Sequence, residues 1–509
     1  IQSKKFSWRK SSLLALKAFE ILLNENSNSK RNLSWAYINE LYKSNFNELI
    51  KKINLDKEIK NYFHESDWKL LAASIDKNNK QLDSFIKANY GLSDIKFWKV
   101  EGPFDSTYSL SILNRCFTEA LAKKITYTSL KITEGPGDYQ PNENFLKYYP
   151  KIFSMYKDSL NENNSVEVVS RNLYPPRVND MRGRFNLLHS YGWEESVFPS
   201  KWVNDFNSNL QGITVMSNQV KKILIDNGVA IPIKVVGLGL DHIAKIQPDN
   251  SLNISLKKFK ILHISSCFPR KGIDILLKAY AKVFNKNDDV SLLIKTFNNP
   301  HNNIEEILDI ERRSNPDFPH VAVLNDDLTD AQVKALYLNS DLFIAPSRGE
   351  GFGLPIGEAM YLRVPVITTG WGGQLDFCNN TNSWLIDFQY APSQSHFNLD
   401  HSYWAEPSVN HLASLISTVY NLPKLEIEKK VDTAFADIYK LDWDLVIDNS
   451  LEFVRKDLCK FTNHISKIGC ISTWNRRCGI ASYSRNILTS FTERVTIFSP
   501  FEATLTGTV

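Results

Sequence analysis

Hydrophobic residues recur at two different spacings along this chain, and the alternation of those spacings predicts an α/β protein. From residue 95 onwards, short apolar runs typical of buried strands alternate with longer stretches of helical spacing. In the stretch 273–284 the large apolar side chains fall at i, i+3, i+4, i+7, i+10 and i+11, which predicts an amphipathic helix. The order strand, tight turn, helix, strand over residues 95–132 is that of a Rossmann-like unit.

The same patterns divide the chain into two α/β halves. The first half has strands expected at 95–100, 125–132, 166–170, 212–217 and 233–239, and helices expected at 109–124 and 218–228. The second half has strands expected at 258–266, 290–297, 320–326, 341–346 and 364–370. We therefore predict a domain at 95–240, a second domain at 241–440, and a helix within 441–462 that returns to the first domain.

The two ends of the chain resemble parts of its middle. Residues 467–500 repeat the strand, glycine turn, helix, strand order that begins near residue 95, and 440–456 resembles the aromatic-start helix at the front. We therefore expect one complete two-domain unit between pieces of two others. Residues 1–23 would be the last helix of a preceding unit, 24–94 a helical linker, and 465–509 the first βαβ of a following unit.

Charge and cysteine content restrict the class of protein. Sixty basic and 56 acidic side chains leave a net charge of +4, which disfavours a nucleic-acid groove and a strongly membrane-bound surface. The six cysteines are scattered, without a CxxC pair or metal-ligand spacing, as expected of reduced thiols in a cytosolic protein. No apolar run reaches the roughly 18 to 20 residues of a membrane span. We expect a cytoplasmic protein, with at most peripheral contact at the inner face of a membrane.

Two turns in the second half carry candidate chemistry. In CFPRKG, Arg270 and Lys271 stand at a helix start directly after a strand, where backbone N–H groups and the helix dipole already favour an anion. The two cations could stabilise a diphosphate leaving group without a metal. A solvated basic turn is the alternative interpretation.

The second turn is SRGEGFGLPIGEAM, residues 347–360. Gly349, Gly351 and Gly353 allow backbone to approach a ligand closely. Glu350 would lie in the loop and Glu358 in the first turns of the following helix. Ionised carboxylates only accept hydrogen bonds, so the pair suits hydroxyl-rich partners such as a sugar ring and a ribose. The alternatives are a solvated loop acid and an acid that compensates the helix dipole.

The combination of these motifs resembles a known family. E-G-F-G-L-P-I-G-E is similar to the E-x7-E motif of retaining glycosyltransferases with the GT-B architecture, family 4, and the resemblance spans about residues 95–460. SSCFPRKGIDILLKAY and TTGWGGQLDF resemble further motifs of that family. The resemblance implies two Rossmann-like domains that face a cleft, here with an additional N-terminal helical region.

The resemblance also implies roles for residues of the second half. Lys271 would contact the donor diphosphate, Glu350 the hydroxyls of the transferred sugar, and Glu358 the ribose. The sugar and phosphate pocket would be lined by the backbone of Phe352, Gly353 and Leu354. Ser266 stands where family members often have an arginine, five positions before the lysine, and Arg270 is a candidate substitute.

The first half would bind the acceptor. Its first turn places Gly102, with Asp105, Ser106 and Tyr108, where the family has a glycine-rich loop that faces the donor phosphates. We interpret SRNLYPPRVNDMRG (170–183) and LLHSYGWEESVFPSKW (187–202) as loops, and the second resembles the W-E-x-S-x-x-P segment of surface-polysaccharide glycosyltransferases. The cleft candidates in these loops are Tyr174, Arg177, Asp180, His189, Trp193 and Glu194. Trp193 could stack on a sugar or belong to the core, and His189 could be catalytic or structural.

The resemblance implies an enzyme that transfers a hexose-type sugar from a nucleoside-diphosphate sugar to a glycan, with retention of anomeric configuration. The surface polysaccharide would be O-antigen, capsule or S-layer glycan, and the acceptor a glycan or lipid-linked glycan. Glu350, Lys271 and Arg270 would be catalytic. No cofactor or metal is expected, and the partners would be flanking units of the same polypeptide. Two alternatives remain open: a non-catalytic glycan-binding module, which the serine at 266 favours, and a nucleotide-sugar epimerase.

Overall fold

The computed structural model describes residues 95–160, 166–183, 185–395, 397, 399–458, 468–471 and 495–498. The predicted helix at 1–23 and linker at 24–94 lie outside the described residues. The chain divides into a unit of residues 92–459 and a second unit formed by 1–91 and 460–509. In the second unit, the described strands β16 (Ile468–Ile471) and β17 (Val495–Phe498) pair in parallel.

The first domain of the larger unit is built on a mostly parallel sheet. Within the described residues this sheet has seven strands in the order β3-β2-β1-β4-β5-β6-β7, and only β2 and β3 run antiparallel. The strands are β1 (Phe97–Gly102), β2 (Tyr127–Glu134), β3 (Gly137–Asp138), β4 (Val168–Arg171), β5 (Phe185–Tyr191), β6 (Gly212–Val215) and β7 (Ile233–Val235). Parallel strands bury both faces, so helices cover this sheet on either side.

The helices of the first domain connect these strands. They are α6 (Ser109–Leu121), α7 (Glu143–Leu146), α8 (Pro150–Ser159), α9 (Ser200–Asn209) and α10 (Asn218–Asp226). The predicted β1–α6–β2 unit is present. The interpretation of 187–202 as one loop is wrong, because its start completes β5 and its end begins α9. The polar residues His189 and Ser190 interrupt the apolar run of β5, so a hydrophobicity pattern does not reveal this strand. Both residues are buried in the strand because they form hydrogen bonds inside the protein.

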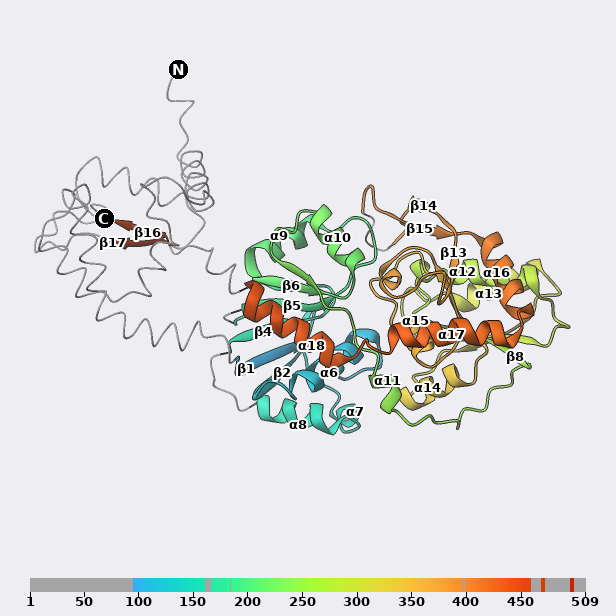
Figure 1. Ribbon diagram of the computed structural model, residues 1–509, viewed down its shortest axis with the longest axis horizontal. Helices are drawn as coiled ribbons and strands as arrows, with labels where there is room; N and C mark the ends of the chain where they lie inside the picture. The colour runs from blue at the N-terminus through green and yellow to red at the C-terminus, as the bar shows by residue number, and fades with distance from the viewer. Residues whose placement is uncertain are drawn as a thin grey trace, which may run out of the picture. The chain divides into compact units, whose positions relative to one another are not determined.

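The second domain has a fully parallel sheet. In the described region it has six strands in the order β10-β9-β8-β11-β12-β13. They are β8 (Phe259–Ile264), β9 (Val290–Lys295), β10 (His320–Leu324), β11 (Leu342–Ala345), β12 (Val366–Thr369) and β13 (Trp384–Ile386). One apolar cluster joins a face of this sheet to α12 (Ile273–Val283), α13 (Ile304–Ser314) and α16 (Val409–Asn421). Another joins the opposite face to α14 (Asp330–Leu338), α15 (Leu354–Tyr361) and α17 (Lys424–Ile438). Two parallel α/β domains were predicted from the sequence, and the structure confirms them (Figure 1).

Two further elements connect the domains. The short helix α11 (His242–Lys245) follows β7 at the passage into the second domain. Helix α18 (Trp443–Glu452) follows α17 and packs against α6 of the first domain (Figure 1). Lys123 and Lys124, just beyond α6, pair with Asp444 at 2.8 Å and Asp448 at 2.5 Å.

A hairpin that was not predicted from the sequence follows β13. Its strands β14 (Phe388–Pro392) and β15 (Tyr403–Pro407) pair in antiparallel fashion, separately from the main sheet. They run beside the turn after β11, where Ala405 N donates to Arg348 O at 3.0 Å. The hairpin therefore belongs to the surroundings of the candidate site.

Candidate active site between two sheet edges

Two loops at the carboxyl edge of the second sheet pack closely together. After β8 the chain forms a single 3₁₀ turn, η2 (Pro269–Lys271), and Gly272 then adopts a φ of +67° to start α12. A Cβ on Gly272 would lie 2.0 Å from Pro346 O in the loop after β11. Glycine is required at this position, because both the dihedral angle and the approach of the second loop exclude a side chain.

Lys271 and Glu350 form a buried ion pair between these loops. Lys271 Nζ lies 2.6 Å from Glu350 Oε1, to which Ser347 Oγ also donates at 2.7 Å. Arg270 Nη1 lies 3.9 Å from Glu350 Oε2. Burial alone would raise the pKa of Glu350, but Lys271 and Arg270 outweigh it and hold that pKa below its usual value. Burial and the neighbouring Arg270 lower the pKa of Lys271.

The first domain closes over this pair. Arg270 Nη2 lies 3.1 Å from Glu194 Oε1 in the loop after β5. A Cβ on Gly349 would lie 2.5 Å from Glu194 O, and Ser217 Oγ donates to Gly351 O at 2.6 Å. The carboxyl edges of the two sheets therefore face each other across this glycine-rich loop. In open α/β sheets this is the edge at which ligands bind.

Glu358 lies away from this ion pair, at the domain linker. Gly353 has a φ of +87° and starts α15, in which Pro355 is the second residue. Glu358 is 7% exposed, and its two oxygens have different partners. Oε1 lies 3.0 Å from His242 Nε2 on α11, and Oε2 accepts from the Tyr337 hydroxyl at 2.9 Å.

The other residues expected in the donor site are placed as follows. Phe352 is buried against Phe377 with ring centroids 4.9 Å apart, so its backbone and not its ring is available to a ligand. Leu354 is buried as the first residue of α15. Ser266 is half-buried after β8, and its carbonyl oxygen accepts from Asn299 Nδ2 at 3.0 Å. A Cβ on Gly102 would lie 2.3 Å from Asn114 Nδ2, so this glycine allows close packing within the first domain.

Arg348, which the sequence analysis missed, braces the glycine-rich loop. It is 7% exposed, forms a bidentate pair with Asp274 at 2.9 and 2.8 Å, and forms a second with Glu406 at 2.6 and 2.7 Å. Its backbone N–H donates to Arg270 O at 2.6 Å. The arginine therefore ties the loop after β11 to η2, to α12 and to the hairpin. An arginine directly before a glycine-rich turn is the signal that could have indicated this role.

The hairpin also forms hydrogen bonds to the first domain. The buried Glu195 accepts hydrogen bonds through Oε2 from Ser393 Oγ at 2.7 Å and Ser402 Oγ at 2.9 Å. Tyr403 N donates to Ser196 Oγ at 2.7 Å. The ring of Phe397 lies 4.9 Å from that of Trp193. One hairpin of the second domain thus holds the loop that carries Glu194.

Two of the acceptor candidates are structural. Trp193 is 3% exposed among Phe198, Trp202 and Phe397, and its Nε1 donates to Val197 O. It is a core tryptophan and cannot stack on a sugar. His189 is 1% exposed in β5, with Nε2 2.8 Å from Asn114 Oδ1 and its ring stacked on Phe117. Burial lowers its pKa to about 3, so the imidazole is neutral.

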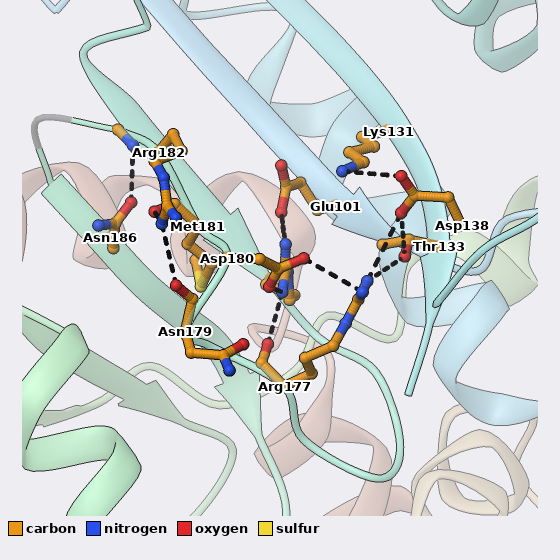
Figure 2. A network of polar contacts seen from close by, with 12 residues as sticks. Glu101, Lys131, Thr133, Asp138, Arg177, Asn179, Asp180, Met181, Arg182 and Asn186 are labelled. Carbon is orange, nitrogen blue, oxygen red and sulfur yellow. Dashed lines mark hydrogen bonds and ion pairs between the residues drawn. The ribbon is translucent and has the colours of Figure 1, made fainter. Parts of the chain in front are cut away.

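Arg177 and Asp180 are engaged in a network of ion pairs, which Figure 2 shows. Asp180 pairs with the buried Arg171 at 2.6 Å and with Arg177 at 3.1 Å, and Arg171 in turn contacts Glu101 at the end of β1. Arg177 Nη2 donates to Thr133 Oγ1 at 2.6 Å and lies 3.5 Å from Asp138. The network holds the 174–183 loop over the carboxyl ends of β1, β2 and β4.

Tyr174 and Glu194 are the acceptor candidates that remain near the donor loops. Tyr174 is 43% exposed, and its ring meets Phe397 and Trp202 edge-on at 6.0 and 6.4 Å. Partial burial and the charges of Glu194 and Glu195 raise its pKa to about 12. Its hydroxyl is therefore protonated near neutral pH, beside the Glu194–Arg270 pair.

The second domain is similar to known proteins. Residues 245–395 match the family model "Glycosyl transferases group 1". A curated relative, the capsular polysaccharide biosynthesis glycosyltransferase CapM of Staphylococcus aureus, is 27% identical over 186 residues, which are 34% of this chain and 47% of that protein. The match thus spans about half the length of this relative. The region 245–395, with its Lys271 and Glu350 loops, is thus similar to glycosyltransferase group 1 domains.

Solved structures identify the two-domain fold. Sucrose-phosphate synthase of Thermosynechococcus elongatus superposes with a TM-score of 0.52 and 17% identity, over 72% of this chain and all of that one. Anabaena HepE, solved with UDP and glucose, superposes with a TM-score of 0.50 and 14% identity over the same shares. The predicted GT-B fold is confirmed. Within the residues that the structure describes, no helix is long and apolar enough to span a membrane, and no three His, Cys, Asp or Glu side chains are grouped as metal ligands.

Proposed function

We propose that this chain is a retaining glycosyltransferase that moves a sugar from a nucleoside diphosphate to a glycan hydroxyl. One observation carries the proposal: Arg270, Lys271 and Glu350 converge at the carboxyl edge of a glycosyltransferase group 1 domain, opposite the first domain. Two cations beside an acceptor-only carboxylate match a diphosphate joined to a hydroxyl-rich sugar.

The chemistry of these residues is electrostatic. Arg270 and Lys271, at the N-terminus of α12, hold the diphosphate in place of their present carboxylate partners. As the bond between the anomeric carbon and the diphosphate oxygen breaks, the two cations stabilise the charge that develops on that oxygen. The acceptor oxygen bonds to the anomeric carbon on the same face, and its proton passes to the departing diphosphate.

The other donor contacts follow from position. Glu350 accepts hydrogen bonds from the transferred sugar, and Glu358 accepts them from the ribose. The backbone of Phe352, Gly353 and Leu354, at the start of α15, lines the sugar and phosphate pocket. Neither glutamate acts as a nucleophile in this scheme, and both orient the donor.

The acceptor lies over the first sheet. Tyr174 offers an exposed aromatic surface beside Glu194, on a loop fixed by the Arg177 and Asp180 network. The name of the Staphylococcus aureus relative concerns capsular polysaccharide biosynthesis, which supports a surface-polysaccharide product. We place the enzyme in the cytoplasm or at the inner face of a membrane, with flanking glycosyltransferase units as its partners.

The test is a panel of nucleoside diphosphate sugars that begins with UDP-glucose, because Anabaena HepE was solved with UDP and glucose. Thermal stabilisation and slow hydrolysis of one donor are expected, and both are lost in Lys271→Ala and weakened in Glu358→Ala. NMR of the released sugar gives its anomeric configuration, which must match that of the donor. No response to any donor would refute the proposal that this chain is an enzyme.

Ser266 is the observation that favours a second candidate, a non-catalytic glycan-binding module. The serine supplies no cation where the related family often has an arginine. This module would bind glycan without stabilisation by any donor. Conversion of the donor to its epimer without an acceptor would instead identify a nucleotide-sugar epimerase.

A further inference from the structure

His242 contacts three structural elements at the point where the chain passes between domains. It is the first residue of α11, and its side chain is 13% exposed. Its Nε2 lies 3.0 Å from Glu358 Oε1 on α15. Its Nδ1 accepts from the indole Nε1 of Trp443, the first residue of α18, at 3.4 Å. One imidazole therefore joins the linker, the donor domain and the helix that returns to the first domain.

The indole determines which nitrogen of this imidazole carries a proton. An indole N–H can only donate a hydrogen bond, so Nδ1 of His242 must be the unprotonated acceptor. In the neutral ring the proton is then on Nε2, which faces Glu358 and donates to its carboxylate. Tyr337 donates to the other oxygen. Among the described residues, each carboxylate oxygen thus has one side-chain donor and keeps a further lone pair for a ligand.

The position of Trp443 is itself fixed by the linker. Its backbone N–H donates to Asp241 Oδ1 at 3.0 Å, and Leu240 N donates to Leu441 O at 2.8 Å. A Cβ on Gly239 would lie 2.3 Å from Trp443 N, so the two segments approach as closely as a glycine permits. The indole donor is therefore held rigidly in front of His242.

We propose that His242 is a positioning residue for the donor ribose, because it orients the Glu358 carboxylate through a tautomer that Trp443 selects. This inference rests on the proposed function, in which Glu358 accepts hydrogen bonds from the ribose hydroxyls. His242 does not touch the donor in this arrangement. It determines the direction in which the remaining lone pairs of Glu358 point, and it makes that direction depend on contacts between the two domains.

The experiment compares how strongly the wild type and its variants bind a nucleotide with ribose hydroxyls and the same nucleotide without them. UDP, GDP, ADP and CDP are first titrated into the full chain by calorimetry, and the tightest binder is compared with its 2′,3′-dideoxy analogue. In His242→Leu we expect affinity for the ribonucleotide to fall about tenfold, as for a lost charge-assisted hydrogen bond. Affinity for the dideoxy analogue should change less than about twofold, because that ligand makes no bond to Glu358.

Two further variants separate positioning from folding. His242→Gln restores an N–H donor near the site of Nε2 and should recover most of the ribonucleotide affinity. Trp443→Phe removes the donor that selects the tautomer and should weaken only the ribonucleotide, by less than His242→Leu does. Both remain informative if His242→Leu does not fold, because the two ligands are compared within one variant.

The outcomes separate the inference from the function on which it rests. Equal loss of both ligands, or no loss of either, in a protein whose wild type binds a nucleoside diphosphate would overturn the role of His242 and leave the proposed function standing. A wild type that binds none of the four nucleotides would overturn both.

Discussion

The ammonium of Lys271 lies 2.6 Å from Glu350 Oε1, so the two charged groups of the candidate site neutralise each other in the absence of a donor. The side chain of Lys271 is 12% exposed and that of Glu350 is 9% exposed. Under the proposed function, a diphosphate that enters would compete with a carboxylate for Lys271, as it would compete with Glu194 for Arg270. Charged groups that the fold holds ready in this way stabilise a leaving group with little reorganisation.

The first prediction separates the stability of this pair from its function. Lys271→Met leaves the buried Glu350 without its nearest cation and with Arg270 at 3.9 Å, and Glu350→Gln leaves two cations together. Each single variant should lose about 3 kcal/mol of unfolding free energy, because one partner of a buried pair stays uncompensated. The double variant should recover most of that loss and still fail to hydrolyse donor. Urea unfolding and donor hydrolysis measure the two effects.

A double variant that hydrolyses donor at the wild-type rate would show that the pair is only structural. A double variant whose loss of unfolding free energy equals the sum of the two single losses would show instead that the two charges do not act on each other.

The second prediction concerns the approach of the domains at Gly349. In Gly349→Ala the new methyl group would meet Glu194 O at 2.5 Å, and backbone must move to accommodate it. We expect the loop and Glu194 to separate, with at least a tenfold loss of kcat, since misplacement of about 1 Å can cost 10²-fold. Gly370→Ala is the control, because its methyl group would meet Ile386 O only at 3.3 Å. Equal rates in the two variants would contradict this account.

The third prediction tests how much the hydrogen bonds between the hairpin and the first domain contribute to stability. Glu195→Ala removes the acceptor of both Ser393 and Ser402 and should lower the unfolding free energy by about 2 kcal/mol, the range for hydrogen bonds to a charged group. Glu195→Gln keeps one acceptor oxygen and should cost less. Hydrogen exchange at Tyr403 N, which donates to Ser196, should become faster in Glu195→Ala. Unchanged protection at that amide would mean that the hairpin holds without Glu195.

Local patterns in the sequence identified β8 to β12 of the second sheet and the two loops that follow β8 and β11, but they missed the edge strand β13. Strand ends, glycines and adjacent charges lie within a few residues of one another, so one sequence is enough to find them. The contacts that stabilise the site join residues that are far apart in the sequence. Arg348 meets Asp274 across 74 positions, and His242 meets Trp443 across 201.

Contacts between residues distant in sequence also explain why some residues predicted to line the cleft have structural roles instead. Trp193 stands in a polar segment that looks like a loop, yet Phe397, from a hairpin about two hundred residues later, covers it. Arg177 and Asp180 are charged residues of a kind often found in clefts, but oppositely charged partners from β3 and β4 pair with them. Burial and pairing of a polar side chain depend on tertiary contacts, which a single sequence does not contain.

The last prediction concerns two buried histidines and the dependence of stability on pH. Burial lowers the pKa of His189 to about 3 and that of His263 to about 4, against 6.5 in the unfolded chain. Above pH 6.5 neither state binds a proton at these sites. Below it the unfolded chain takes up protons that the folded protein refuses, so the free energy of unfolding falls as the pH falls. Each histidine contributes up to about 1.4 kcal/mol per pH unit until its folded pKa is reached.

His189→Gln tests this contribution, because glutamine can donate to Asn114 but does not titrate. Its unfolding free energy should be lower than that of the wild type at pH 7, and should fall less steeply between pH 6 and pH 4.5. Phe117→Leu is the matched control, since it removes the ring that stacks on His189 and leaves the histidine in place. It should be destabilised with a slope close to that of the wild type. Urea unfolding at several pH values measures both slopes, and a wild-type slope in His189→Gln would mean that this histidine takes up a proton in the folded state.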